Sequence, residues 1–171
     1  MIEMTEYVKR REALMKRVGG NAIVILPAAP EIMRNGDSSY FYRQNSDFYY
    51  LTGFSEPEAM LVLAPKHEEG EYILFNRERN PDREIWDGPR VGQADACKKY
   101  LADKSYAFSE WEDKLFDLSS GRETIYYPIG RYLWLDEAIM RTVNRLRALV
   151  RTGVKVPQGF VDVLTLIHEM R

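Results

Sequence analysis

The chain has 171 residues, of which 45% are apolar and 29% charged, and its formal net charge is −2. These values are ordinary for a globular protein. The chain lacks the strong excess of basic residues that favours binding to nucleic acid or to an anionic membrane. No stretch approaches the roughly 18 consecutive apolar residues that a membrane span needs, so we expect no membrane-spanning helix.

The first residues of the chain predict a helix followed by a buried strand. Residues 5–18, TEYVKRREALMKRV, have the spacing of an amphipathic helix, with Thr5 as its N-cap and the following glycine pair as its end. The run NAIVILPA is short, rich in β-branched residues and ended by Pro27, as is typical of a buried strand. Residues 27–41 then predict a loop.

A polar cluster that turns abruptly aromatic, YRQNSDFYYLTGF, occupies residues 42–54. Ser46 predicts a helix N-cap with Asp47 in the first turn, and Gly53 predicts a left-handed C-cap, so SDFYYLTG has the pattern of a short capped helix. A strand is the rival interpretation, because aromatic residues favour sheets.

The polar residues around the start of this segment predict a structural network, and direct catalysis is the alternative. A buried arginine such as Arg43 needs a partner, because an unpaired buried charge is costly, and Asp37 or Asp47 can supply one. Gln44 and its neighbours can satisfy loop carbonyl groups. The predicted network comprises Asp37, Arg43, Asn45, Ser46 and Asp47.

The middle of the chain predicts a hairpin and a polar loop. AMLVLAP at 59–65 and EYILFN at 71–76 are two strands joined by the turn sequence KHEEG. Residues 77–92 form a long polar segment with two prolines and two glycines, which predicts a loop, and 93–102 predict a short helix.

Strand and helix patterns alternate in the remainder of the chain. SYAFS and ETIYYP predict strands, EWEDKLFDLSSG and residues 135–151 predict helices, and FVDVLTLIHEMR is either helical or extended. This alternation implies an α/β layered fold, and the hairpin makes its sheet mixed rather than purely parallel. There is no repeat and no linker, so we expect one domain over 1–171.

Few residues in the sequence suit catalysis or metal binding. His67 and His168 are the only histidines, and HEMR lacks the second histidine of the zinc motif H-E-x-x-H. G-x-S-x-G, P-loop, G-x-G-x-x-G and C-x-x-C motifs do not occur, so we expect no catalytic and no metal-binding residue. Cys97, the single cysteine, and a charged N-terminus without a signal-peptide core suggest a cytoplasmic location.

Two segments resemble the N-terminal domain of Xaa-Pro aminopeptidases (aminopeptidase P). They are GDSSYFYRQNSDFYYLTGFSEPEAMLVL and LFNRERNPDREIWDGPRVGQ, and the likeness extends from the first helix to IHEMR. The resemblance implies the α/β fold of the creatinase and aminopeptidase P N-terminal domains, a mixed sheet of about six strands flanked by helices. A prolidase or creatinase relative is one alternative, and a stand-alone binding or scaffold module with the same fold is another.

The resemblance further implies that this domain is not catalytic by itself. In the family, a C-terminal pita-bread domain holds two metal ions, usually manganese, which activate water to cleave the bond before a proline in second position. We expect that domain beyond residue 171, because the chain stops abruptly on HEMR and lacks such ligands. The N-terminal domain is expected to assemble a homo-oligomer and to narrow access to the active site, with peptides as partners and neither nucleic acid nor membrane.

The resemblance assigns two residues to the neighbourhood of the substrate. Trp86 matches the tryptophan of EIW, which in the family extends towards a neighbouring subunit's active site; the alternative is that Trp86 anchors its own loop. Arg151 matches an arginine near the end of the long helix by spacing alone, because RTGVKVPQ is only loosely similar to the family. Arg151 can equally continue a solvated basic row with Arg141, Arg145 and Arg147.

Overall fold

The computed structural model describes residues 1–36 and 38–171 of the chain. Its elements are α1 (Met4–Val18), β1 (Ala22–Pro27), α2 (Ser46–Thr52), β2 (Met60–Leu63), β3 (Tyr72–Asn76), α3 (Pro81–Asp87), α4 (Gly92–Tyr100), β4 (Lys104–Ala107), η1 (Phe108–Glu110), α5 (Trp111–Ser119), β5 (Thr124–Tyr127), α6 (Leu133–Arg147), η2 (Val150–Thr152), β6 (Gly159–Asp162) and α7 (Val163–Met170), where η denotes a 3-10 turn.

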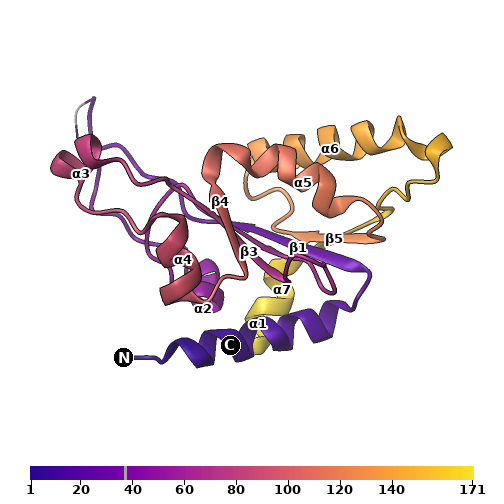
Figure 1. Cartoon of the computed structure of the whole chain (residues 1–171), viewed down its shortest axis with the longest axis horizontal. Helices are drawn as coiled ribbons and strands as arrows, with labels where there is room; N and C mark the ends of the chain where they lie inside the picture. Colours follow the sequence, from indigo (N-terminus) through magenta and orange to yellow (C-terminus); the bar gives the residue numbers. More distant parts are fainter. Residues whose placement is uncertain (37) are drawn as a thin grey trace.

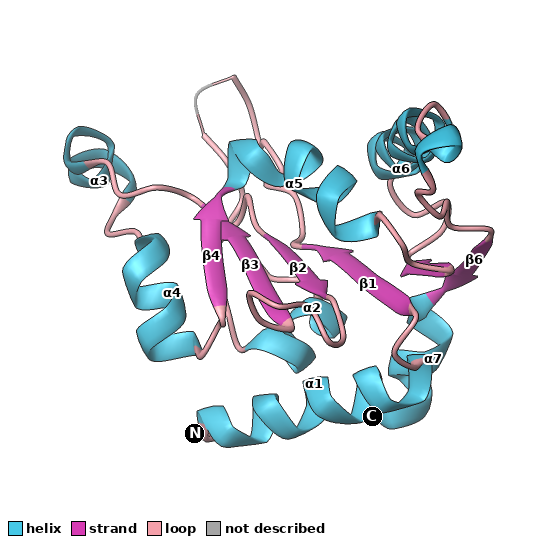
Figure 2. Ribbon diagram, turned by 45° about the vertical axis from the view of Figure 1, so that its right-hand side comes forward, coloured by secondary structure: helices cyan, strands magenta, loops and turns pink. Residues whose placement is uncertain are grey.

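The strands form one six-stranded sheet in the order β4-β3-β2-β1-β5-β6 (Figure 2). β2 is antiparallel to both of its neighbours, whereas the pairs β1–β5, β3–β4 and β5–β6 are parallel. All strands except β2 therefore run in the same direction and end at the same edge of the sheet, which we call the carboxyl edge. The predicted mixed α/β sheet is confirmed.

Helices cover both faces of the sheet, with α1, α2, α4 and α7 on one face and α5 and α6 on the other (Figures 1 and 2). β1 supplies both cores, because its successive side chains point to opposite faces: Val24 packs with the α1 side and Ile25 with the α5 side. This burial on both faces explains why its sequence is a continuous apolar run rather than an alternation.

Polar side chains fasten the turns at the opposite edge of the sheet, where the parallel strands begin. Arg122, ahead of β5, donates hydrogen bonds from Nη1 to the carbonyl oxygens of Gly20, Ala22 and Pro65 at 3.1, 3.1 and 2.8 Å. This guanidinium therefore joins the chain entering β1 to the turn that follows β2.

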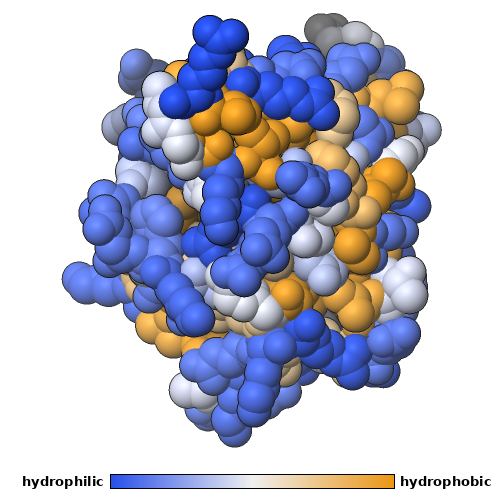
Figure 3. Space-filling view, turned by 90° about the vertical axis from the view of Figure 1, so that its right-hand side faces the viewer, coloured by the Kyte–Doolittle hydropathy of each residue, from blue (hydrophilic) through white to orange (hydrophobic). Residues whose placement is uncertain are grey.

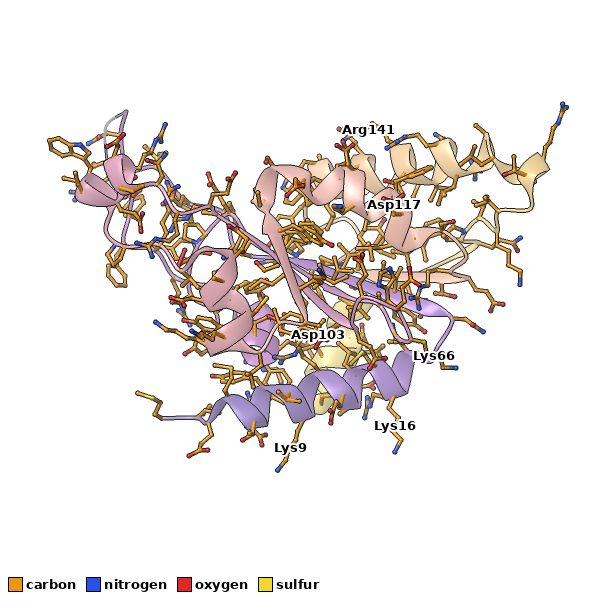
Figure 4. The ribbon with its side chains drawn as sticks, in the orientation of Figure 1. Lys9, Lys16, Lys66, Asp103, Asp117 and Arg141 are labelled. Carbon is orange, nitrogen blue, oxygen red and sulfur yellow. The ribbon has the colours of Figure 1, made fainter. Side chains whose placement is uncertain are left out.

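Charged residues on the helices and in the turn before β4 differ in their environment (Figure 4). Arg141 on α6 pairs with Glu112 on α5 at 2.6 Å, and the pair joins the two helices on that face. Asp103, at the foot of β4, accepts hydrogen bonds from the backbone of the turn before β3. Lys9 and Lys16 point from α1 away from the sheet (Figure 4).

Within the described residues, no helix is both long and apolar enough to cross a membrane.

Several predicted boundaries differ from the structure. The first helix starts at Met4, so Thr5 is not its N-cap, and the long helix is Leu133–Arg147, with η2 following as a separate turn. The C-terminal segment is both extended and helical, as β6 and then α7. The largest difference is α3, a helix within the predicted loop 77–92.

Candidate functional site

Trp86 lies on α3, which projects from one end of the molecule (Figure 1). No residue of α3 is buried, and the side chains of Ile85 and Trp86 are 78% and 87% exposed. The indole therefore does not anchor its own loop. We call residues 77–92, which leave β3, form α3 and lead into α4, the α3 arm.

The α3 arm is held in shape by polar contacts at Glu84. The Glu84 carboxylate accepts hydrogen bonds from Arg79 Nε at 2.8 Å, from the Asn80 backbone at 2.9 Å and from the Arg90 backbone at 2.7 Å. These bonds, first among them the one from the Arg90 N–H, lower the pKa of Glu84 below its ordinary value. Asn80 caps the helix and Pro81 starts it, which explains why α3 forms without a buried face.

The base of the α3 arm is fixed to the body of the domain. Glu56 pairs with Arg77 at 3.3 Å on the outgoing side and accepts a hydrogen bond from the Val91 backbone at 2.8 Å on the returning side. The buried Asn76 side chain donates to the Gly92 carbonyl oxygen at 3.0 Å. The arm is therefore a fixed support for two exposed apolar side chains.

A second exposed apolar segment leaves the same carboxyl edge of the sheet. It follows β1, whereas the α3 arm follows β3, and these two strands point in the same direction. Its backbone is closed by a hydrogen bond from Tyr40 to the Ile32 carbonyl oxygen at 2.8 Å. Its large exposed side chains are Ile32, Met33, Tyr40 and Phe41.

Arg151 is exposed and lies on η2, beyond the end of the long helix. η2 leads towards the start of β6, so it lies near the edge opposite the carboxyl edge, and α3 and the C-terminal end of α6 are at opposite ends of the molecule (Figure 1). The structure therefore does not bring Arg151 and Trp86 together within one chain. In the view onto the α6 end, hydrophilic side chains surround smaller apolar patches (Figure 3).

The polar cluster before α2 is a hydrogen-bond network, but its cap is displaced by one residue from the prediction. Asn45 Oδ1 accepts hydrogen bonds from the backbone of Asp47 at 2.9 Å and of Phe48 at 3.0 Å. Asn45 is therefore the N-cap, and Ser46 is the exposed first residue of the helix. The predicted left-handed C-cap at Gly53 is confirmed, with φ +66°.

Gln44 is the centre of this network, although the predicted set of network residues left it out and gave it only a role in satisfying loop carbonyl groups. Its Oε1 atom accepts hydrogen bonds from the backbone of Ala29 and of Asn45, both at 2.9 Å, and its Nε2 atom donates to the Glu56 carbonyl oxygen at 3.0 Å. The Tyr42 hydroxyl donates to the Ala29 carbonyl oxygen at 2.7 Å. The one signal for this role was chemical: an amide side chain both donates and accepts, so it can join several loop segments.

The predicted pairing of Arg43 with an aspartate is not formed among the described residues. Arg43 is exposed and makes no hydrogen bond or ion pair within the described chain. Asp47 is buried and pairs instead with Arg171 at 2.9 Å. His168 Nε2 lies 3.5 Å from the other carboxylate oxygen of Asp47. Asp37, also predicted in this network, lies outside the described residues.

The described residues include no group of three or more His, Cys, Asp or Glu side chains that could hold a metal ion. They therefore do not provide the donor set for the pair of manganese ions that the resemblance implies, and no chemical step through a metal is assigned to this chain.

Comparisons with known proteins agree with the resemblance seen in the sequence. The family model described as "Aminopeptidase P, N-terminal domain" matches residues 7–126. The Xaa-Pro aminopeptidase of Escherichia coli is 39% identical over 171 residues, which are 99% of this chain and 39% of that protein. Human Xaa-Pro aminopeptidase 3 is 28% identical over 97% of this chain and 36% of its own length.

Solved structures show the same fold. The structure of the Pseudomonas aeruginosa aminopeptidase PepP superposes with a TM-score of 0.93 at 46% identity, covering 98% of this chain and 38% of that one. Aminopeptidase P from E. coli in its low-pH form gives a TM-score of 0.92 at 39% identity, covering 100% of this chain and 39% of that one. The chain thus spans about two fifths of the length of these relatives.

Proposed function

Because the chain belongs to the aminopeptidase P N-terminal domain family, we propose that it is the non-catalytic N-terminal domain of a manganese-dependent Xaa-Pro aminopeptidase. Such an enzyme removes the N-terminal residue of a peptide whose second residue is proline. A catalytic domain outside residues 1–171 would hold the two Mn²⁺ ions, which would supply activation of water and polarisation of the scissile carbonyl. This chain contributes to assembly of a homo-oligomer and to control of substrate access.

The observation that carries the proposal is the α3 arm. Large apolar side chains held rigidly in solvent are typical of interaction sites, and tryptophan is prominent among the residues that dominate interfaces. Ile85 and Trp86 contact no core of their own chain, although Glu84 and Asn80 fix the helix that carries them. We infer that the arm of one subunit packs at the active-site entrance of another.

The Trp86 indole is suited to the wall of a proline subsite. A flat aromatic face packs well against the pyrrolidine ring of proline. Its rigid placement narrows the entrance of the active site, so that only an extended end of a peptide chain can enter. Arg151 lies on η2, which follows α6, and the C-terminal end of α6 is at the opposite end of the molecule from α3 (Figure 1). In this proposal, a Trp86 and an Arg151 that approach one peptide come from two different subunits.

The test uses the full-length enzyme with the substitution Trp86→Ala. We expect kcat/KM on a tripeptide with proline second to fall by about 10-fold or more, the cost of losing an aromatic contact, with metal content unchanged. Met140→Ala, which shortens a partly exposed apolar side chain on α6, is the matched control and should leave kcat/KM unchanged. An unaltered rate for Trp86→Ala would remove the indole from the substrate site.

Subunit mixing tests whether the arm acts on a neighbour. Trp86→Ala subunits keep intact metal sites, and subunits with a substituted metal ligand keep intact arms. Mixed oligomers should therefore recover activity above the sum of the two parents. If mixing under conditions of subunit exchange gives no recovery, the arm serves its own subunit and the proposal of gating between subunits is wrong.

We also propose that the protein works in the cytoplasm. The single cysteine, Cys97, supports this location, since it cannot form an intramolecular disulfide. Fractionation of cells that express the full-length protein tests it, and recovery outside the cytoplasm would overturn it.

A further inference from the structure

A groove of about 350 Å³ opens at the carboxyl edge of the sheet and shares no lining residue with the α3 arm. Pro27 at the end of β1, Ala28 just after it and Ala59 just before β2 line the groove, and the Ala28 N–H donates a hydrogen bond to the Ala59 carbonyl oxygen at 2.9 Å. Trp111, at the start of α5, and Trp134, in the first turn of α6, form its aromatic wall. The polar network meets this groove only at the backbone of Ala29, and the proposed gating role does not use it.

The topology of the sheet makes this position favourable for a ligand. β1 and β5 are parallel neighbours, but the chain leaves β1 for α2 on one face and leaves β5 for α6 on the other. In open α/β sheets, ligands bind in the crevice beyond the carboxyl ends of two such strands, where the connections diverge. The groove lies there, between the chain after β1 and the start of α6.

The aromatic wall is a corner rather than a flat stack. The rings of Trp111 and Trp134 are 5.6 Å apart between centroids with an interplanar angle of 72°, and Tyr132 supports Trp134 at 5.9 Å. Trp134 is 42% exposed, so part of its ring is open to solvent. Exposed indole faces attract planar cations, and a guanidinium group can stack on them.

The charges around the groove favour a cation. Glu31 and Glu58 lie on its rim, both are exposed, and neither forms an ion pair with a described residue. No lysine or arginine is among the described residues that line the groove. Glu58 also has a left-handed backbone, with φ +51°, a conformation in which glycine is the relaxed residue.

We propose that this groove binds the arginine side chain of a peptide. The guanidinium stacks on the Trp134 face and pairs with Glu31 and Glu58, and the apolar surface of Pro27 and Pro30 accommodates the flanking residues. Arginine fits better than lysine, because only its planar fork can stack and form bidentate hydrogen bonds together. The proposal rests on the groove and not on the proposed aminopeptidase function.

The test is calorimetric titration of the protein with acetyl-Ala-Arg-Ala-amide, whose blocked ends exclude binding at an active site that requires a free N-terminus. The matched probe is the same peptide with citrulline, which keeps the shape of arginine and removes its charge. We expect binding that weakens with salt, and a loss of about 10-fold or more with citrulline or in the double variant Glu31→Gln/Glu58→Gln. Glu137→Gln, an exposed glutamate one turn from Trp134, should bind as the wild type does.

Two further variants separate binding from folding. Trp134→Leu keeps an apolar side chain but removes the aromatic face. It should weaken binding of the arginine peptide and leave the affinity for the citrulline peptide unchanged. Glu58→Gly should raise the melting temperature by relaxing the backbone and at the same time weaken binding. No binding at millimolar peptide, equal binding of arginine and citrulline, or an equal loss in Glu137→Gln would each overturn the proposal.

Discussion

The N-cap of α2 gives the sharpest test of the structure against the sequence prediction. Asn45→Ala removes the oxygen that accepts hydrogen bonds from the backbone of Asp47 and Phe48, at 2.9 and 3.0 Å. Loss of an asparagine cap costs about 1 kcal/mol, within a range of about 0.5–2 kcal/mol. Because Phe48 is fully buried in the core on the α1 side, we expect the free energy of unfolding of the whole domain to fall by this amount.

The measurement is reversible unfolding in urea followed by circular dichroism, with thermal unfolding alongside. For a chain of this size, a loss of 1 kcal/mol lowers the melting temperature by about 2–4 °C. Ser46→Ala is the matched control, since Ser46 is exposed and is the residue that the sequence predicted as the cap. Its effect should stay within about 0.5 kcal/mol. A greater loss for Ser46→Ala than for Asn45→Ala would refute the assignment of the cap.

Two further predictions concern the C-cap of α2 and the α3 arm. Gly53→Ala should destabilise the domain by about 1–3 kcal/mol in the same unfolding assay, because a Cβ there meets Tyr7 Cε2 at 2.8 Å and φ is +66°. Gly121→Ala, where φ is +82° and nothing lies within 4 Å of the added Cβ, should destabilise the domain less. Equal destabilisation by the two substitutions would show that the contact with Tyr7 is unimportant. Because the folded state lowers the pKa of Glu84, the stabilisation of the arm should be complete above the ordinary carboxylate value of 4.5 and be lost as pH falls through the lower folded value. Hydrogen exchange of the arm amides reports this loss, and a pH response that survives in Glu84→Gln would assign it to another group.

Strands β1, β2 and β3 were predictable because each carries its own signal. The β1 run is apolar at every position since both faces of the strand are buried, and the hairpin of β2 and β3 is specified by two such runs around a polar turn. Helix α2 was predictable from its ends, although Asn45 and Ser46 are both good capping residues. Only the backbone of the folded chain decides which of two adjacent capping residues is used.

The partners of Asp47 were not predictable from the local sequence. A buried aspartate beside Arg43 suggests a local pair, but the structure supplies Arg171, which is 124 residues away in sequence. Such a contact depends on how α7 packs against α2, and single-sequence patterns contain no information on that packing. The helix in the α3 arm was missed for a different reason: it buries no face, so it has no apolar period, and its signals were Asn80 and Pro81.

The direction of the strands explains where the exposed features gather. Four of the strands end at one edge of the sheet: β1, β3, β4 and β5. The apolar segment after β1 and the α3 arm therefore leave the sheet at this edge, and the aromatic groove opens there. At the opposite edge, Arg122 fastens the turns by hydrogen bonds to backbone carbonyl groups. Substitutions at the carboxyl edge should therefore change binding more than stability, and those around Arg122 the reverse. This difference follows from the burial of the central strands, because their side chains are covered on both faces whereas the loops beyond their ends are exposed.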